Sequence, residues 1–302
     1  MTMTMARTKA RFATHGYVGI AIVVGAEALL FAGNQLVGHW FTPIVWTGYV
    51  LFMDALVYKL KGRSLLMNDR LGFLVIAIVS IAAWWLCEFY NAPRFWNSNL
   101  ELWWHYHSLE PNLFLRRVGY DWAFATIFPA LFETAELFTI TVFGRMKLAK
   151  TFSLSKPLLV AFSVVGAVAV ILPLVFPSRW LAPVLWLSFI LLLDPLNALR
   201  GWPSIIGDIS RGDWRRLWAL LASGLVCGVL WEFWNYWALS KWTYTVPYFG
   251  SIKIFEMPVL GYLGFLPFAV ECWAIYIFCR SLLTPRPGNV STAESIWIET
   301  NA

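Results

Sequence analysis

Apolar runs long enough to cross a bilayer recur along the whole chain and constrain its fold more than any other feature. A helix needs roughly 20 apolar residues to cross the hydrocarbon core of a membrane. Only 13% of the 302 residues are charged, whereas about a quarter is usual in soluble domains. The sequence therefore predicts an all-α, polytopic membrane helical bundle. We expect eight spans, at about 16–37, 41–60, 72–91, 121–143, 157–176, 181–199, 216–237 and 258–280.

Lysine and arginine gather in alternate connections between these spans. They stand in the N-terminal segment, in the connections after the second, fourth and sixth spans, and after the eighth. Because basic connections stay in the cytoplasm, both termini are predicted to be cytoplasmic. The net charge of +6 then indicates orientation in a lipid bilayer rather than nucleic-acid binding. We expect an integral, multi-pass protein of a bacterial inner membrane, and the sequence carries no signal for its oligomeric state.

Two halves of the chain resemble each other at a nearly constant shift. "HWFTPIVWTGYVLFMDAL" aligns with "RWLAPVLWLSFILLLDPL", and "WLCEFYN" aligns with "VLWEFWN". A further match places Glu133 opposite Glu271. Each copy contains four spans, an even number, so both copies enter the membrane in the same sense. The sequence therefore predicts two parallel four-helix repeats related by an axis along the membrane normal. The matched pairs at a shift of 140 are Trp40 and Trp180, Pro43 and Pro183, Trp46 and Trp186, Leu51 and Leu191, Asp54 and Asp194, and Ser64 and Ser204.

The predicted segments follow from the spans and the repeat. Residues 1–15 form a basic cytoplasmic segment and residues 16–145 the first repeat. Residues 146–156 are a cytoplasmic linker and residues 157–281 the second repeat. Residues 282–302 are polar, contain Pro and Gly, and are predicted to be a disordered cytoplasmic tail.

Acidic residues inside the spans are the first candidates for function, because a charge buried in lipid is costly. We predict catalytic roles for Glu133 and Glu271 near mid-membrane, and for Glu88 and Glu232 near the outer ends of their spans. The structural alternative is that Glu88 and Glu232 only reach the interface within an aromatic belt. Glu27 has no counterpart in the second copy, where Val168 stands. Supporting acids are predicted at Glu136, Asp54 and Asp194, although the two aspartates could instead face water or pair with nearby Lys and Arg.

Aromatic residues make up 18% of the chain, and acids beside aromatic rings suit one chemistry especially. A neutral carboxylic acid in an apolar site can protonate an alkene. Ring faces can then stabilise the carbocation, and a second, ionised acid can remove a proton. The cysteines show no CxxC pair and the histidines no spaced ligand motif, so we expect neither a metal nor a cofactor. Predicted substrate-binding residues are Trp231, Trp242, Tyr244, Asn235, Asn91, Trp96 and Trp85.

The second copy resembles a known family across roughly residues 217–280. In "LWEFWNYWALSKWTY" an acid follows a span and "WTY" comes ten residues later, before a Gly and an apolar run with Pro and Glu. This pattern is similar to the integral-membrane lycopene cyclases of carotenoid biosynthesis, of the bacterial heterodimeric and fungal fused type. The resemblance carries over to Glu232, Trp242, Thr243, Tyr244, Gly250 and Glu271, and more loosely to Glu88, Trp96 and Glu133.

The resemblance implies an isomerase that closes rings at the linear ends of lycopene, or of another isoprenoid lipid, by adding and removing a proton. The family's Pro-x-Glu-Glu motif is replaced here by Pro267-Phe-Ala-Val-Glu271. Two other functions fit the residues. Parallel repeats and mid-membrane acids also suit a transporter or proton-coupled carrier, and a non-enzymatic membrane scaffold would use the acids only to join the two halves.

Overall fold

A computed structural model describes residues 10–91, 103–245, 250–283 and 295–297. Among these residues, eight helices are long and apolar enough to cross a membrane, which confirms the predicted α-helical class. They are α1 (Thr14–Phe31), α3 (Phe41–Lys61), α5 (Arg70–Asn91), α6 (Leu113–Thr141), α7 (Lys156–Val175), α8 (Ala182–Leu199), α10 (Arg215–Trp237) and α11 (Tyr262–Leu283).

The helix α6 begins at Leu113, well before the expected start near residue 121. The side chain of Asn112 accepts hydrogen bonds from the backbone N–H groups of Phe114 and Leu115, and so caps the helix. The first turns contain Arg116 and Arg117, which hydropathy excludes from a span. A helix that projects beyond the apolar layer can contain such charges. The Asn112 cap, and not the hydropathy, therefore sets the start of α6.

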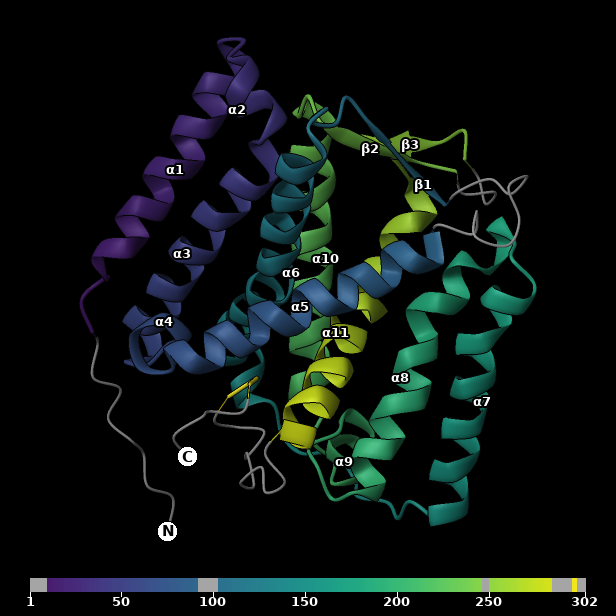
Figure 1. The fold of residues 1–302 in the computed structure, drawn as a ribbon. Coiled ribbons are helices and arrows are strands. Elements are labelled where there is room, and N and C mark those ends of the chain that lie inside the picture. The colour runs from purple at the N-terminus through teal and green to yellow at the C-terminus, as the bar shows by residue number, and fades with distance from the viewer. Residues whose placement is uncertain (1–9, 92–102, 246–249, 284–294, 298–302) are drawn as a thin grey trace.

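The two halves of the chain pack their helices in the same pairs. In the first half, α1 packs on α3, α3 on α6, and α5 on α6; in the second, α7 packs on α8, α8 on α11, and α10 on α11. Between the halves α6 packs on α10, so these two helices lie at the centre of the bundle (Figure 1). The pairs α1–α3 and α7–α8 lie on opposite flanks, and α5 crosses the bundle obliquely in this view.

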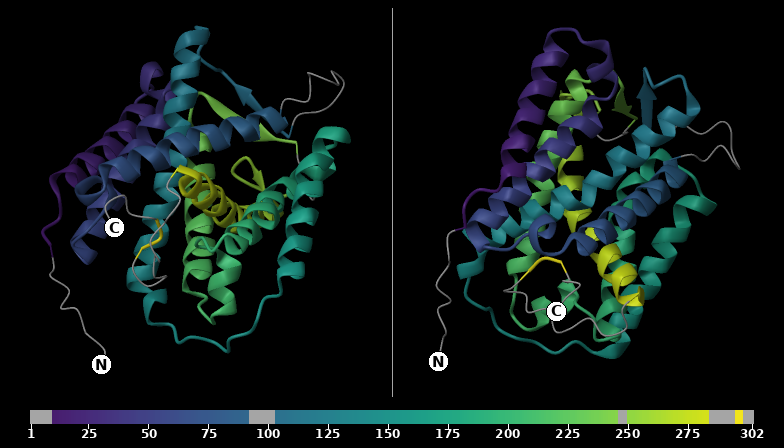
Figure 2. Two further views of the ribbon diagram at one scale, coloured as in Figure 1. Left: turned by 60° about the horizontal axis from the view of Figure 1, so that its bottom comes forward. Right: turned by 60° about the vertical axis from the view of Figure 1, so that its left-hand side comes forward.

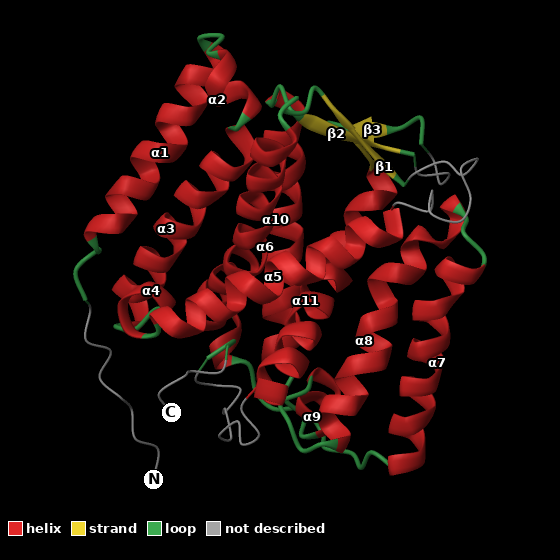
Figure 3. Ribbon diagram, in the orientation of Figure 1, coloured by secondary structure: helices red, strands yellow, loops and turns green. Residues whose placement is uncertain are grey.

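A two-stranded ribbon closes one end of the bundle, which we call the ribbon end. The strand β1 (Trp104–His107) pairs antiparallel with β2 (Lys241–Tyr244), and Trp104 lies opposite Tyr244 while Tyr106 lies opposite Trp242 (Figure 3). A second short pair, β3 (Lys253–Ile254) and β4 (Met257–Pro258), lies in the connection to α11. The link between α6 and α7 runs along the opposite end (Figure 2).

The shorter helices lie in the connections between the spans. They are α2 (Gln35–His39), α4 (Leu65–Asn68), α9 (Ile205–Ser210), and the 3₁₀ turns η2 (Phe143–Arg145), η3 (Arg179–Leu181) and η4 (Val259–Gly261). The start of α4 and the start of α9 are each held by a matched aspartate. Asp54 accepts hydrogen bonds from the backbone of Leu66 and from Ser64 Oγ, both at 2.8 Å. Asp194 accepts from the backbone N–H groups of Ile205 and Ile206 at 2.7 and 2.8 Å.

Neither aspartate faces water, since Asp54 is 0% exposed and Asp194 is 3% exposed. Asp54 pairs additionally with His15 Nε2 at 2.8 Å. Because a buried N–H without an acceptor is costly, each aspartate fixes the turn that follows its span. This geometry gives both side chains a role in stability.

We expect Asp194→Ala to lower the free energy of unfolding by about 2 kcal/mol or more, because two backbone donors lose their acceptor. Denaturation of the purified protein, followed by tryptophan fluorescence, measures this change. Lys253→Ala is the control, since Lys253 is an exposed residue of β3 and substitutions at such sites usually change stability by less than about 0.5 kcal/mol. Equal losses in both variants would contradict the role of Asp194.

Three residues of the C-terminal segment, for which the sequence predicts disorder, are described and buried. Ser295, Ile296 and Trp297 are 3%, 1% and 2% exposed. The backbone N–H of Ile296 donates to Glu136 Oε2 at 2.8 Å, and Trp273 Nε1 donates to the Ile296 carbonyl at 2.7 Å. This short piece therefore packs against α6 and α11. Ile296 and Trp297 supply the apolar contact. The average composition of the tail, which is polar, does not reveal these two side chains.

Candidate functional site

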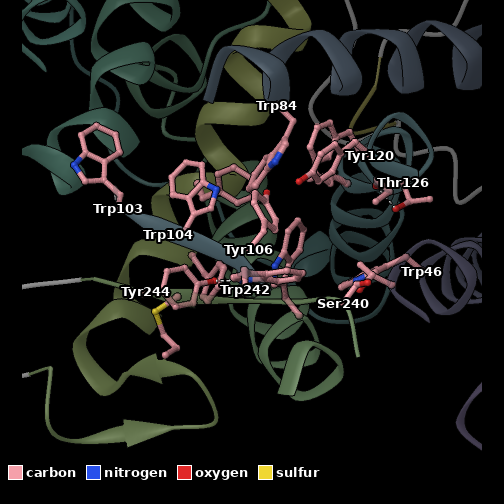
Figure 4. A pocket seen from close by; sticks show the side chains of 18 of the residues that line it. Trp46, Trp84, Trp103, Trp104, Tyr106, Tyr120, Thr126, Ser240, Trp242 and Tyr244 are labelled. Atoms are coloured by element: carbon pink, nitrogen blue, oxygen red, sulfur yellow. Dashed lines mark hydrogen bonds between the residues drawn. The ribbon is translucent and has the colours of Figure 1, made fainter. Parts of the chain in front are cut away.

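A cavity of about 650 Å³ lies at the ribbon end of the bundle. Its wall combines side chains of both halves of the chain, from α3, α5, β1, α6, α8, α10, β2 and α11. Most of this wall is apolar, and aromatic rings dominate it (Figure 4). The rings that matter for the argument below are Trp46, Trp84, Trp104, Trp186, Trp231 and Trp242.

Several of these rings are in mutual contact. The ring centroid of Trp231 lies 5.4 Å from that of Trp84, 5.6 Å from that of Trp242 and 5.7 Å from that of Trp46. The ring centroid of Phe268 lies 5.3 Å from that of Trp186 and 5.8 Å from that of Trp84. Because neighbouring rings hold one another in place, the wall presents fixed aromatic surfaces to whatever occupies the cavity.

The carboxylate of Glu88 is connected to the cavity wall by hydrogen bonds from three side chains. Its Oε1 accepts hydrogen bonds from Tyr106 Oη at 2.5 Å, Trp84 Nε1 at 3.2 Å and Trp104 Nε1 at 3.3 Å. All three donors line the cavity, whereas Glu88 itself does not. Its side chain is half-buried.

Glu232, which the sequence pairs with Glu88, has fewer hydrogen-bond partners. Tyr244 Oη donates to Glu232 Oε1 at 2.6 Å, and Trp242 Nε1 donates to Tyr244 Oη at 2.6 Å. Glu232 is 0% exposed, and its Oε2 has no hydrogen bond within the described residues. Tyr244 and Trp242 line the cavity. The two acids thus contact the cavity through a tyrosine each, in unequal surroundings.

The two tyrosines lie on the ribbon and remain hydrogen-bond donors. Burial, and then the charge of Glu88, raises the pKa of the Tyr106 hydroxyl well above its ordinary value. Burial, and then the charge of Glu232, does the same to the pKa of Tyr244. Both hydroxyls therefore keep their protons at neutral pH, and each lies within proton-transfer distance of its glutamate.

Asn91 and Asn235 hold the two strands in place. Asn91 Oδ1 accepts from the backbone N–H groups of Trp103 and Trp104, and its Nδ2 donates to the Trp104 carbonyl at 3.0 Å. Asn235 makes the same kind of clamp on Trp242, with hydrogen bonds of 2.9 and 2.8 Å. Neither amide lines the cavity. Their contribution is to position the aromatic residues that do.

The two mid-span glutamates lie away from the cavity wall. Glu133 is 0% exposed, neither of its oxygens has a hydrogen bond within the described residues, and its acidic neighbours are Asp54 and Glu136. Glu271 is 3% exposed and lies near Cys87 of α5 and the backbone of Phe189 of α8. The structure therefore brings Glu88 and Glu232 to the cavity and leaves Glu133 and Glu271 deeper in the bundle.

Three further expected site residues have other surroundings. Glu136 pairs with Lys61 at 2.7 Å and accepts from the Ile296 backbone. Trp85 donates to Asp121 at 2.6 Å and lies under the guanidinium of Arg117. Trp96 lies outside the described residues.

The sequence comparison missed Trp104 and Tyr106, the first-half counterparts of Trp242 and Tyr244. The signal was present, because "WHY" at 104–106 and "WTY" at 242–244 share a W-x-Y pattern. Trp104 lies 13 residues after Asn91, whereas Trp242 lies seven after Asn235. This difference in spacing moves Trp104 out of register with Trp242, so the alignment of the two halves selected Trp96 instead.

Within the described ranges, no group of three His, Cys, Asp or Glu side chains could bind a metal. Comparison of the chain with protein-family models, with curated proteins and with solved structures finds no match. The site must therefore be interpreted from its own geometry.

Proposed function

We propose that the protein is an integral-membrane enzyme that cyclises or isomerises an isoprenoid lipid by adding and removing a proton. The observation that carries this proposal is the aromatic cavity with two tyrosine–glutamate pairs in its wall. The resemblance to integral-membrane lycopene cyclases implies the same chemistry, and lycopene is the first substrate to test.

The reaction would need three things from the chain. Glu232, through Tyr244, would supply a proton to a terminal carbon–carbon double bond, which leaves a cation on the adjacent carbon. A second double bond would attack that cation and close the ring, while the faces of Trp231 and Trp242 stabilise the charge. Glu88, through Tyr106, would accept a proton from a neighbouring carbon and restore a double bond. The proton gained equals the proton lost, so no oxidant or reductant is required.

The cavity's edge supports entry from lipid. Leu187 of α8, Leu260 of η4 and Leu263 of α11 line the cavity and are exposed at the bundle surface. In a bilayer these apolar side chains would contact lipid tails. An isoprenoid dissolved in the membrane could therefore reach the aromatic chamber between α8 and α11 without crossing water.

We further propose that the chain consists of two parallel four-helix repeats, with both termini in the cytoplasm and the ribbon end outside. The helix pairs common to both halves support the repeat, and the lysines and arginines of alternate connections support the orientation. The ribbon register supports the repeat as well, since an axis between His105 and Thr243 exchanges Trp104–Tyr106 with Trp242–Tyr244. Two acid–tyrosine pairs facing one cavity are the arrangement that such an axis would generate.

Expression in cells that accumulate lycopene tests the enzymatic proposal. We expect a cyclised pigment in the extract, identified by chromatography and mass, with unchanged elemental composition. An unchanged pigment profile in cells that contain folded protein would exclude lycopene. Profiling of the other isoprenoid lipids in the same extracts would then show whether any substrate is isomerised; a proton-coupled carrier would change none of them.

A further inference from the structure

Polar side chains gather at one part of the cavity wall, at the ribbon end. They are His39, Glu110, Arg116 and Ser240, and all four are half-buried. We call this set the polar mouth. Figure 4 shows Ser240 in the wall beside the aromatic rings. These groups give one part of an otherwise apolar cavity the capacity to form hydrogen bonds with a ligand.

The hydrogen bonds of His39 determine which of its ring nitrogens carries the proton. Nδ1 lies 3.1 Å from the carbonyl oxygen of Ser108 and 3.2 Å from Ser240 Oγ. Ser240 Oγ donates its own proton to the same carbonyl at 2.7 Å. Since a carbonyl can only accept, Nδ1 is a protonated nitrogen, and Nε2 is an acceptor in the ring that carries this one proton. Nε2 has no hydrogen bond within the described residues.

Arg116 supplies the complementary donors. Its Nε donates to the backbone carbonyl of Glu110 at 2.7 Å. Its two terminal nitrogens make no hydrogen bond to a described residue and carry donors only. The Glu110 carboxylate accepts from the backbone of Asn112 at 3.1 Å. One positive and one negative group therefore lie at the polar mouth, and their charges balance.

A short strained segment ties these groups together. Ser108 has a φ of 50°, which is uncommon for a residue other than glycine and costs of order 1–3 kcal/mol. His39 and Ser240 both bond the Ser108 carbonyl, and Arg116 bonds the carbonyl of Glu110, two residues later. The hydrogen bonds that position His39, Ser240 and Arg116 therefore also stabilise the strained segment at Ser108.

We propose that the polar mouth binds a hydroxyl group, and that the natural ligand of the cavity is an isoprenoid alcohol. A hydroxyl is both a donor and an acceptor, so its chemistry matches the acceptor nitrogen of His39 and the donor nitrogens of Arg116. A diphosphate would meet the carboxylate of Glu110 and a ring nitrogen that only accepts, and the balanced charge gives it no net attraction. This inference rests on the proposed function, in which the cavity holds an isoprenoid chain.

Three ligands with one skeleton test the proposal: retinol, retinyl methyl ether and the corresponding hydrocarbon lacking the oxygen. Each absorbs where tryptophan emits, so binding to the purified full-length protein is measured by quenching of the tryptophans around the cavity. We expect retinol to bind about tenfold more tightly than the hydrocarbon, a difference of about 1.4 kcal/mol. The ether keeps the acceptor oxygen but has no proton to donate, so it should bind with intermediate affinity.

His39→Phe and Arg116→Met separate the two contacts. His39→Phe should remove the preference for retinol over the ether, and Arg116→Met should remove the preference for the ether over the hydrocarbon. Lys253→Met, at an exposed site in β3, should leave both preferences unchanged. Unaltered affinity for the hydrocarbon shows that the cavity of each variant is intact.

Equal affinity of the wild-type protein for all three ligands would overturn the proposal while leaving the cavity an isoprenoid site. Binding of none of the three would overturn both this inference and the proposed function. A preference for retinol that survives in both variants would also overturn it, because the hydroxyl would then lie elsewhere.

Discussion

Glu232→Gln is expected to reduce turnover of the isoprenoid substrate about a thousandfold, within the range found for general acids, and to leave the protein folded. The amide has nearly the shape of the carboxyl group, and its oxygen can still accept from Tyr244 Oη. It cannot give up a proton to that hydroxyl. The measurement is the initial rate with membranes that contain equal amounts of folded variant and wild-type protein.

Two comparisons make this prediction sharp. Glu27→Gln is the control, because Glu27 of α1 accepts a hydrogen bond from Trp234 Nε1, which the amide oxygen can still accept, and Glu27 does not line the cavity; this variant should keep full activity. Tyr244→Phe should lose activity to a similar degree, since it removes the link between Glu232 and the cavity. Glu271→Gln should lose far less than Glu232→Gln. If Glu271→Gln were the inactive variant and Glu232→Gln active, the reacting acid would be the deeper one and the cavity assignment would fail.

Gly224→Ala is expected to lower the free energy of unfolding by about 3 kcal/mol, at the upper end of the usual cost of overpacking. A Cβ atom at Gly224 would lie 2.1 Å from the carbonyl oxygen of Phe265, so α10 and α11 would have to separate. The obstacle is backbone, which cannot move aside as a flexible side chain could. Thermal or denaturant unfolding in one detergent, followed by tryptophan fluorescence, gives the difference.

Gly25→Ala is the matched control, because a Cβ at Gly25 of α1 meets nothing within 4 Å. Both substitutions replace glycine by alanine inside a helix, which favours the helix by about 1 kcal/mol. The difference between the two variants therefore measures the cost of the steric clash at Gly224. We expect Gly25→Ala to raise the free energy of unfolding by up to about 1 kcal/mol. Similar stability of the two variants would mean that α10 and α11 are not in contact at Gly224.

Hydropathy alone was enough to locate the helices, because each must keep an apolar surface over the thickness of a bilayer. The exception at the start of α6 is instructive. Asn112 caps a helix whose first turns carry arginines, and a local side-chain bond decides the boundary there. The matched acids and asparagines were also visible in the sequence, since charged and amide groups stand out among apolar residues.

The roles of those matched residues could not be derived in the same way. Asp54 and Asp194 are paired in sequence, but only the fold shows that their acceptors hold the turns before α4 and α9. Trp104 and Tyr106 were overlooked because Trp104 follows Asn91 by 13 residues, whereas Trp242 follows Asn235 by seven. Whether an acid contacts a cavity depends on the direction of its side chain and on the residues that lie between the acid and the cavity. The spacing of residues along the sequence specifies neither.

The sequence by itself determined that this chain is a multi-pass helical protein with matched intramembrane acids, because burial in lipid restricts composition residue by residue. Only the tertiary structure decided which acids serve the cavity. The antiparallel pairing of β1 with β2 joins segments far apart in the chain and places Tyr106 and Tyr244 over one chamber. That pairing depends on how the two halves pack, so Glu88 and Glu232 become candidates for proton transfer through a contact that no local pattern specifies.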